Sequence, residues 1–268
     1  MALNFRQTEI LALAKAEGKV VVEALAAYFD VTHQTIRRDL TELCEAGRLE
    51  RVYGGAVLPS GVANIGYEDR RLLNAEAKER IARICAQQIP DDASLFLNIG
   101  TTVEAVARAL MQHNNLMVVT NNMNVANTLL ANPSCEVMVA GGVVRRSDGG
   151  MVGDLTADMV RQFKVDYAVI GASALDNEGD LLDFDFREVR VSQVLIRNAR
   201  HTFLVSDVSK FSRGAPVRIA SLRDVDTFFT DAAPPEPVRR LCREWETRLE
   251  IAPPETPATL GQAEVSRA

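Results

Sequence analysis

A Gly-Thr-Thr turn, Gly100–Thr102, joins an apolar segment to an amphipathic one in the stretch LFLNIGTTVEAVARAL at 95–110. At the start of a helix, backbone N–H groups and the two hydroxyls can converge on an anion, which the positive end of the helix dipole attracts. A turn of this composition can also do no more than cap a helix, so the motif alone leaves anion binding and capping open.

Two further polar turns favour anion binding. TNN at 120–122 and AGG at 140–142 each follow an apolar run that predicts a strand. In open α/β sheets, ligands bind beyond the carboxyl ends of the strands. We therefore expect Thr120, Asn121 and Gly141 to share one ligand site with Gly100–Thr102.

A second group of residues with binding chemistry lies near the N-terminus. Thr32 can N-cap a helix that extends to about Ala46, and Ile36, Leu40 and Leu43 lie on one face of that helix. The N-terminal half of the helix carries no acidic side chain before residue 39, and its outer face presents hydrogen-bonding side chains. These candidates for DNA contact are Thr32, Gln34, Thr35, Arg37 and Arg38.

A recognition helix uses its N-terminal turns to reach base edges, where Arg pairs with guanine and Gln with adenine, while other basic side chains contact phosphates. After Gly47, RLERVYGGAVL alternates like two short strands about Gly54-Gly55, which is typical of a wing and adds Arg48 and Arg51. The pattern predicts a winged helix-turn-helix that binds double-stranded DNA. A helical protein-interaction domain with a solvated arginine pair is the alternative.

Charge and composition limit the other classes of protein. The net charge is −6, and that of residues 1–58 is −1, so contact with DNA must come from a local patch. No apolar run approaches a membrane span and no secretory signal is visible, so we expect a soluble cytoplasmic protein. Cys44, Cys85, Cys135 and Cys242 are scattered, which indicates neither a disulfide framework nor a metal site. We expect no cofactor.

The periodicity of the chain divides it into parts that position these groups. Residues 1–58 read as three short amphipathic helices and a hairpin, and Pro and Gly interrupt the pattern in a linker at 59–74. From 75 to 251, strand-like runs alternate with helix-like stretches, which predicts βαβ units around a parallel sheet, and 252–268 reads as a disordered tail. The strand-like runs are ASLFLNI, LMVVT, CEVMVA, DYAVIG and HTFLVS.

The segment TIRRDLTELCEAGRLERVYGGAVL resembles the N-terminal signature of the DeoR family of bacterial transcriptional regulators. The resemblance continues through most of the chain, in NIGTTVEAVA, TNNMNVANTL, AGGVVRRSDGGMVGD, FDFREVR and SDVSKFSR. Members of this family carry a winged helix-turn-helix followed by a sugar-phosphate-sensing domain. The resemblance implies a repressor whose affinity for operator DNA falls when a small phosphorylated metabolite binds, with glycerol 3-phosphate the first candidate and another sugar phosphate the second.

The family also implies further residues of the effector site. Asp185 and Glu188 match positions that contribute acidic side chains, and Lys210 matches a basic one that can pair with a phosphate. A solvated helix face for the carboxylates and a surface position for the lysine are the alternatives. Asn98 stands where the family often has Asp, which leaves its role open. Because one winged module covers a short DNA site, we expect a homodimer or homotetramer.

The sensing domain of the family resembles ribose-5-phosphate isomerase in fold, so a phosphosugar isomerase is the rival function. Such an enzyme needs a carboxylate base placed to take a carbon-bound proton. The acidic turn that supplies it in the isomerases is replaced here by Gly171-Ala172-Ser173 after the run DYAVI. Ligand sensing without turnover is therefore the simpler expectation. A protein-docking module is the third possibility.

Overall fold

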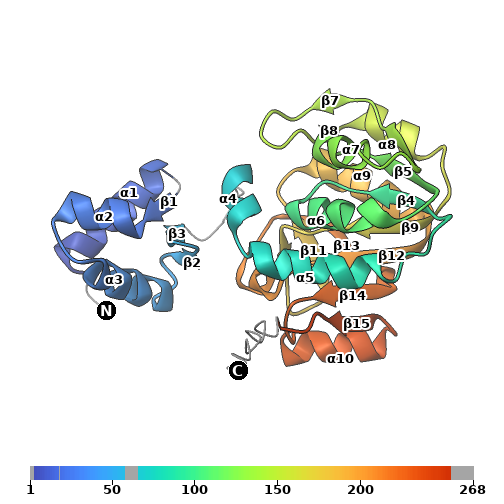
Figure 1. Cartoon of the computed structure of the whole chain (residues 1–268). Helices are drawn as coiled ribbons and strands as arrows, with labels where there is room; N and C mark the ends of the chain where they lie inside the picture. The colour runs from blue at the N-terminus through green and yellow to red at the C-terminus, as the bar shows by residue number, and fades with distance from the viewer. Residues whose placement is uncertain (1–2, 18, 58–65, 255–268) are drawn as a thin grey trace, which may run out of the picture.

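A computed structural model of the chain describes residues 3–17, 19–57 and 66–254. Figure 1 shows a small N-terminal module, a short helix beyond it and a larger α/β domain. Within the described residues, no helix is both long enough and apolar enough to cross a membrane.

The N-terminal module has three helices and three short strands. These are α1 (Phe5–Glu17), β1 (Lys19–Val21), α2 (Val22–Phe29), α3 (His33–Glu45), β2 (Glu50–Val52) and β3 (Gly55–Val57). Strand β3 pairs antiparallel with β2, which confirms the predicted hairpin, and also with β1. Sequence patterns do not reveal β1, because its partner β3 is distant in the chain and no short turn joins the two strands.

Helix α3 is fixed by its buried face and its N-cap. Ile36, Leu40 and Leu43 are fully buried against the other elements of the module. The Thr32 side chain accepts a hydrogen bond from the backbone N–H of Thr35 at 3.3 Å. Both features confirm the sequence prediction, and they leave the opposite face of α3 to solvent.

The larger domain is built on a seven-stranded sheet. Its strands are β4 (Ser94–Leu97), β5 (Leu116–Thr120), β6 (Cys135–Val139), β9 (Val165–Ile170), β12 (Ala199–Val205), β14 (Thr227–Thr230) and β15 (Arg248–Ile251). They lie in the order β15-β14-β12-β9-β4-β5-β6, and every neighbouring pair is parallel. The predicted parallel α/β sheet is confirmed, and it extends on one side by two strands that the sequence patterns do not reveal, β14 and the edge strand β15.

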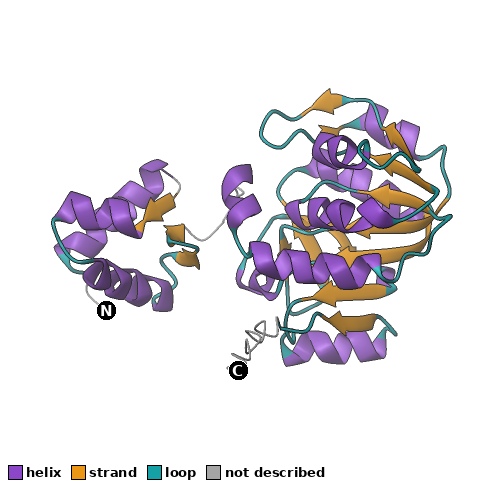
Figure 2. Cartoon of the chain, viewed as in Figure 1, coloured by secondary structure: helices purple, strands orange, loops and turns teal. Residues whose placement is uncertain are grey.

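Helices cover both faces of the sheet (Figure 2). They are α5 (Ala75–Ala86), α6 (Thr101–Ala109), α7 (Met123–Leu129), α8 (Asp154–Val160), α9 (Phe186–Arg197) and α10 (Glu236–Glu244). In β4, Leu95 and Leu97 pack with α5, α6 and α7, whereas Phe96 between them packs with α8 and α9. Because successive strand residues point to opposite faces, a strand covered on both sides is apolar throughout.

Short elements extend the domain beyond the main sheet. They are η1 (Leu110–Gln112), β7 (Val143–Val144), β8 (Met151–Val152), β10 (Ala174–Leu175), β11 (Asp180–Asp183), η2 (Val208–Ser212), β13 (Val217–Ser221) and η3 (Leu222–Asp224). Strands β10, β11 and β13 form a second, antiparallel sheet, and β7 and β8 form a hairpin.

The segment expected to be a linker holds a helix, α4 (Tyr67–Leu72). The Tyr67 hydroxyl donates a hydrogen bond to Glu104 Oε2 of α6 at 2.9 Å, which attaches α4 to the larger domain. Of the expected linker and disordered tail, residues 59–65 and 255–268 lie outside the described residues.

Candidate functional site

The outer face of α3 is the first candidate site. Thr32, Gln34, Arg37 and Arg38 are exposed there, and Thr35 is half-buried. Most of the Arg38 side chain, 82%, is exposed, and its Nε lies 3.1 Å from Glu42 Oε1 one turn further along. An exposed ion pair of this kind is weak, so the guanidinium can exchange it for another acceptor.

Polar groups on the inner side of α3 hold it against α1. Asp39 is buried and forms an ion pair with Arg6, and Gln7 donates a hydrogen bond to Glu42 at 2.7 Å. These contacts fix the rotation of α3, so the exposed side chains keep one orientation.

The wing adds further exposed groups beside α3. Arg48 and Arg51 are both exposed, and so is Tyr53 at the turn of the hairpin. The sequence analysis did not include Tyr53 among the candidates for DNA contact. Its position directly before Gly54-Gly55, at the predicted turn of the wing, is the signal that could have identified it.

A cavity at the carboxyl ends of β4, β9 and β12 is the second candidate site. It brings together five of the predicted effector residues, which are Gly100, Thr101, Thr102, Glu188 and Lys210. Its lining also includes three polar side chains that sequence reasoning missed, which are Arg70, Ser173 and Asp183. These three come from α4, the turn after β9 and the end of β11, and only the folded chain brings them together.

The Gly-Thr-Thr turn lies where strand β4 gives way to helix α6. Gly100 has a φ of +143°, which an L-residue rarely adopts, and no side chain caps the helix. The N-cap residue therefore offers no side-chain acceptor to the first N–H groups of α6, and the dipole of the helix adds a positive potential there. This end of the cavity suits an anion.

Basic side chains gather at this end. Lys210 is half-buried, and loss of water, reinforced by Arg213 and Lys78, lowers its pKa to about 7 in spite of Asp207. Burial likewise lowers the pKa of Lys78 to about 8. Although burial opposes its ionisation, Asp207 has a lowered pKa because of Lys210 and hydrogen bonds. The cations outnumber this one carboxylate, so a further negative charge would be stabilised here.

Two acidic side chains, Asp183 and Glu188, also belong to the lining. Asp183 is buried and accepts a hydrogen bond from the Ser173 hydroxyl at 2.8 Å. Burial and the neighbouring Asp183 raise the pKa of Glu188 to about 8, against the opposing effect of Arg145. Glu188 is only 8% exposed, which excludes the solvated helix face considered as its alternative. Such groups can bind the hydroxyls of a ligand.

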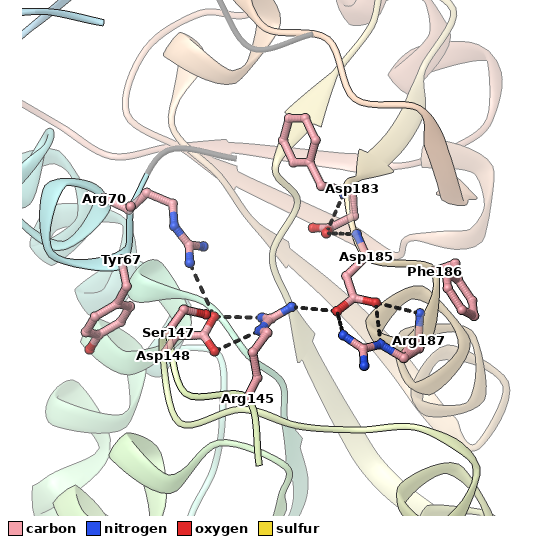
Figure 3. A pocket seen from close by; sticks show the side chains of 11 residues that line it. Tyr67, Arg70, Arg145, Ser147, Asp148, Asp183, Asp185, Phe186 and Arg187 are labelled. Atoms are coloured by element: carbon pink, nitrogen blue, oxygen red, sulfur yellow. Dashed lines mark hydrogen bonds and ion pairs between the residues drawn. The ribbon is translucent and has the colours of Figure 1, made fainter. Parts of the chain in front are cut away.

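Arg145 organises the carboxylates next to the cavity, as Figure 3 shows for Asp148 and Asp185. It donates to Asp148 at 2.9 and 2.6 Å, and its guanidinium lies 3.3 Å from Asp185 and 2.6 Å from Glu188. Asp185 also caps α9 and pairs with Arg187, and it lines an adjoining, more open pocket rather than the cavity itself.

The remaining predicted residues lie outside the cavity lining. Thr120 donates to the Leu97 carbonyl at 2.6 Å and Asn121 to the Met151 carbonyl at 3.1 Å. Asn98 is buried and donates to Ser192 Oγ at 2.8 Å. Gly141 is exposed. The cavity instead uses the turns after β9 and β12, because β9 is the other neighbour of β4 in the sheet.

A winged helix-turn-helix module is joined here to an α/β domain that has a polar cavity. This combination is typical of DNA-binding proteins that respond to a ligand. The DeoR-like helix-turn-helix domain matches residues 6–62, and the DeoR C terminal sensor domain matches residues 73–232. The chain belongs to the DeoR family, which confirms the resemblance inferred from its motifs.

Relatives of known name match almost the whole chain. The glycerol-3-phosphate regulon repressor of Escherichia coli (strain K12) is 46% identical over 246 residues, which cover 92% of this chain and 98% of that protein. The repressor of the same name from Haemophilus influenzae is 43% identical over 249 residues, which cover 93% of this chain and 97% of that protein. A solved D-ribose-5-phosphate isomerase in complex with phospho-erythronic acid has a TM-score of 0.39 and 16% identity, covering 51% of this chain and 54% of that one.

Proposed function

We propose that this chain is a transcriptional repressor that binds operator DNA through α3 and the wing, and releases it when glycerol 3-phosphate occupies the cavity. The observation that carries the proposal is the division of the cavity lining into basic and acidic groups. Gly100–Thr102 and Lys210 suit a phosphate, whereas Asp183 and Glu188 suit hydroxyls. Glycerol 3-phosphate has both kinds of group, and the names of the relatives support this ligand before other sugar phosphates.

Binding without turnover fits the state of the acidic groups. A general base must be free to take a proton from the substrate, but Glu188 is paired with Arg145 and Asp183 accepts three hydrogen bonds, from Ser173 and from the backbone of Phe184 and Asp185. We therefore propose a cytoplasmic sensor rather than an isomerase. Nuclear magnetic resonance of the ligand after prolonged incubation with the protein should show it unchanged, and a new product would contradict this part of the proposal.

Specific repression requires at least two copies of the winged module on two half-sites. We propose that the chain forms a homodimer or homotetramer through the larger domain. Exposed apolar side chains on β7, at the start of α8 and at the start of α9 support this surface. They are Val143, Val144, Leu155 and Phe186.

Titration of a preformed operator complex tests the proposed switch. An effector weakens DNA binding only if it binds the DNA-incompetent arrangement more tightly, and coupling energies of about 1–3 kcal/mol correspond to roughly 5- to 150-fold. Glycerol 3-phosphate should therefore weaken operator affinity within that range, and operator DNA should weaken ligand binding by the same factor. Release by uncharged glycerol as readily as by its phosphate would contradict the anion site.

Two substitutions test the residues of the anion site. Lys210→Ala removes a cation, and Thr101→Val removes a hydroxyl while keeping the shape of the side chain. Both variants should keep their affinity for operator DNA and lose the response to glycerol 3-phosphate. A wild-type response in both would remove these residues from the site.

A further inference from the structure

Arg70 extends from helix α4 into the cavity, although α4 lies before the α/β domain proper in the chain. Only 14% of its side chain is exposed, and Arg70 is shared between the lining of the cavity and that of the adjoining pocket. Its Nε is buried and has no hydrogen-bond partner among the described residues. A buried guanidinium N–H without an acceptor costs free energy. This N–H group is therefore available to donate a hydrogen bond to an anion.

The one ion pair of Arg70 among the described residues is long. A terminal nitrogen lies 3.3 Å from Asp148 Oδ2, and Asp148 is already held by two shorter bonds from Arg145. Figure 3 shows Asp148 between the two guanidinium groups, with Arg70 coming from one side. If Arg70 turned toward another anion, Asp148 would keep its stronger partner.

The backbone of α4 is bound to the same site. The Arg70 carbonyl accepts hydrogen bonds from Lys78 Nζ and, at 3.4 Å, from the Thr101 hydroxyl. Lys78 Nζ also donates to the Leu73 carbonyl at 2.6 Å. Thr101 begins the turn proposed to bind phosphate, so its hydroxyl is the donor for which α4 and a phosphate would compete.

We propose that Arg70 is a phosphate ligand of the effector site and that α4 is the element through which the site reports its occupancy. This inference rests on the proposed function and adds the means of regulation. A phosphate at Gly100–Thr102 would attract the Arg70 guanidinium away from Asp148 and take the Thr101 hydroxyl from the Arg70 carbonyl. Both changes act on α4, which connects to the DNA-binding module through residues 58–66.

A second contact lies between the cavity and the wing. Arg213 Nε is 3.8 Å from Glu50 Oε2 of β2, and both side chains are largely buried. Arg213 and Lys210 both act on the pKa of Glu50, opposing the rise that its burial causes. The cations near the anion site therefore lie next to the wing as well as to α4. A ligand that binds these cations can change contacts with both elements, which supports coupling between effector binding and DNA binding.

Arg70→Gln in the full-length chain tests the inference, with Arg71→Gln as the matched control. Arg71 is the next residue of α4, but it is exposed and pairs only loosely with Glu68, at 3.5 Å. Calorimetric titration should show that Arg70→Gln weakens binding of glycerol 3-phosphate and of inorganic phosphate by roughly 10- to 100-fold, as expected for one charged hydrogen bond. The dissociation constants of Arg71→Gln for both ligands should stay within about twofold of those of the wild type.

Arg70→Lys keeps the charge but loses the planar guanidinium, so it should recover part of the lost affinity. It keeps the test conclusive if the Gln variant does not fold. Hydrogen exchange supplies the readout of regulation. In the wild type, inorganic phosphate should change the exchange of the α4 amides at 67–72, and in Arg70→Gln it should not.

The outcomes separate this inference from the proposed function. If glycerol 3-phosphate releases the wild-type protein from DNA and Arg70→Gln responds equally well, the function stands and the role of Arg70 is overturned. If the wild type binds inorganic phosphate with help from Arg70 but glycerol 3-phosphate releases no DNA, the role of Arg70 stands and the assigned effector is wrong. A wild-type chain that binds neither ligand overturns both.

Discussion

At the scale of single residues, Arg38 has the geometry of a DNA contact, because the buried stripe of α3 and the contacts of α3 with α1 point its side chain to solvent. Arg38→Ala should keep the fold and weaken operator binding. If Arg38 pairs with a base, the binding free energy should fall by about 1–3 kcal/mol, and the protein should become less selective for the base at that position of the operator. If it contacts a phosphate, all sequences should weaken alike and the salt dependence should flatten.

Fluorescence polarisation with operator DNA at several salt concentrations distinguishes these cases. Glu42→Gln is the control, since it removes the charge that pairs with Arg38 while its amide oxygen can still accept the hydrogen bond from Gln7. The control should bind DNA at least as well as the wild type. Wild-type affinity in Arg38→Ala at moderate salt would refute the orientation of α3.

The basic residues of the cavity predict a pH dependence of effector binding. The pKa of Lys210 is about 7 in the folded protein, so at pH 8 this amine is largely neutral, and a phosphate beside it would raise the pKa again. The complex then holds more protons than the free protein, so affinity should fall as the pH rises from about 7 to 9. Titration calorimetry at pH 8 in buffers of different ionisation enthalpy should detect proton uptake.

Lys210→Arg is the control for this measurement, because arginine stays charged throughout this range. Proton uptake should fall in this variant, and the remainder belongs to Lys78, whose pKa is about 8. Unchanged uptake in Lys210→Arg would show that Lys210 is not the group that titrates.

The sequence revealed residues of the cavity where a local motif marks them. Gly100–Thr102 are visible because a turn, a strand and a helix are adjacent in the chain, and Glu188 and Lys210 were supplied by family resemblance. Arg70, Ser173 and Asp183 were missed, since each comes from a segment whose neighbours are set by the order of strands in the sheet. Periodicity shows which face of an element is buried, but not which elements meet.

At the scale of elements, the wing depends on a close approach between β1 and β3. A Cβ at Gly55 would lie 1.8 Å from the Val20 carbonyl oxygen, and a backbone oxygen cannot rotate away as a side chain can. Gly55→Ala should therefore destabilise the N-terminal module by at least about 3 kcal/mol, the upper end of the usual cost of overpacking. Gly54→Ala has open space around the new methyl group, so only its left-handed backbone, with a φ of +73°, should cost stability, by about 1–2 kcal/mol.

Two optical signals separate the modules in this experiment. The chain has one tryptophan, Trp245, which lies in the larger domain next to α10. Urea unfolding followed by Trp245 fluorescence should be unchanged in Gly55→Ala, whereas the transition of the N-terminal module followed by circular dichroism should shift. Equal midpoints for Gly54→Ala and Gly55→Ala would contradict the proposed clash.

The sequence predicted elements well where they are long and regular. The helices of the N-terminal module have apolar residues at helical spacing and the central strands are continuous apolar runs, because each helix buries one face and each central strand buries both. Helix α4 falls in the segment that the sequence predicts as a linker, because its six residues, YEDRRL, carry mixed charges; in the structure none of their side chains is buried. Its position depends instead on the Tyr67 hydroxyl and the carbonyl groups that Lys78 binds.

At the scale of the whole molecule, exposed apolar side chains predict where copies of the chain meet. Leu155 at the start of α8 is 73% exposed, and the ion pair between Arg190 and Asp154, at 3.1 Å, joins α8 to α9 beside it. Leu155→Glu should dissociate the assembly at micromolar concentration, because a charge at the centre of an apolar interface is not paired. Analytical ultracentrifugation of the full-length chain measures this.

Leu130→Glu is the control for the oligomer, since Leu130 is 69% exposed but belongs to the end of α7. This variant should sediment like the wild type. A wild-type chain that is strictly monomeric at micromolar concentration would contradict the assembly itself, and equal effects of the two variants would contradict the chosen surface.

The gathering of Arg70, Lys78 and Arg213 around Lys210, beside the buried carboxylate of Asp207, has a practical consequence for handling the protein. A small dianion that occupies the anion site stabilises the folded chain by mass action, by about 2.7 kcal/mol when its concentration is a hundredfold above the dissociation constant. Phosphate or sulfate in a purification buffer should therefore raise the melting temperature and, by the same linkage, compete with the true effector. Screening of ligands by thermal shift should consequently begin in a chloride buffer, where such background occupancy does not mask a weak metabolite.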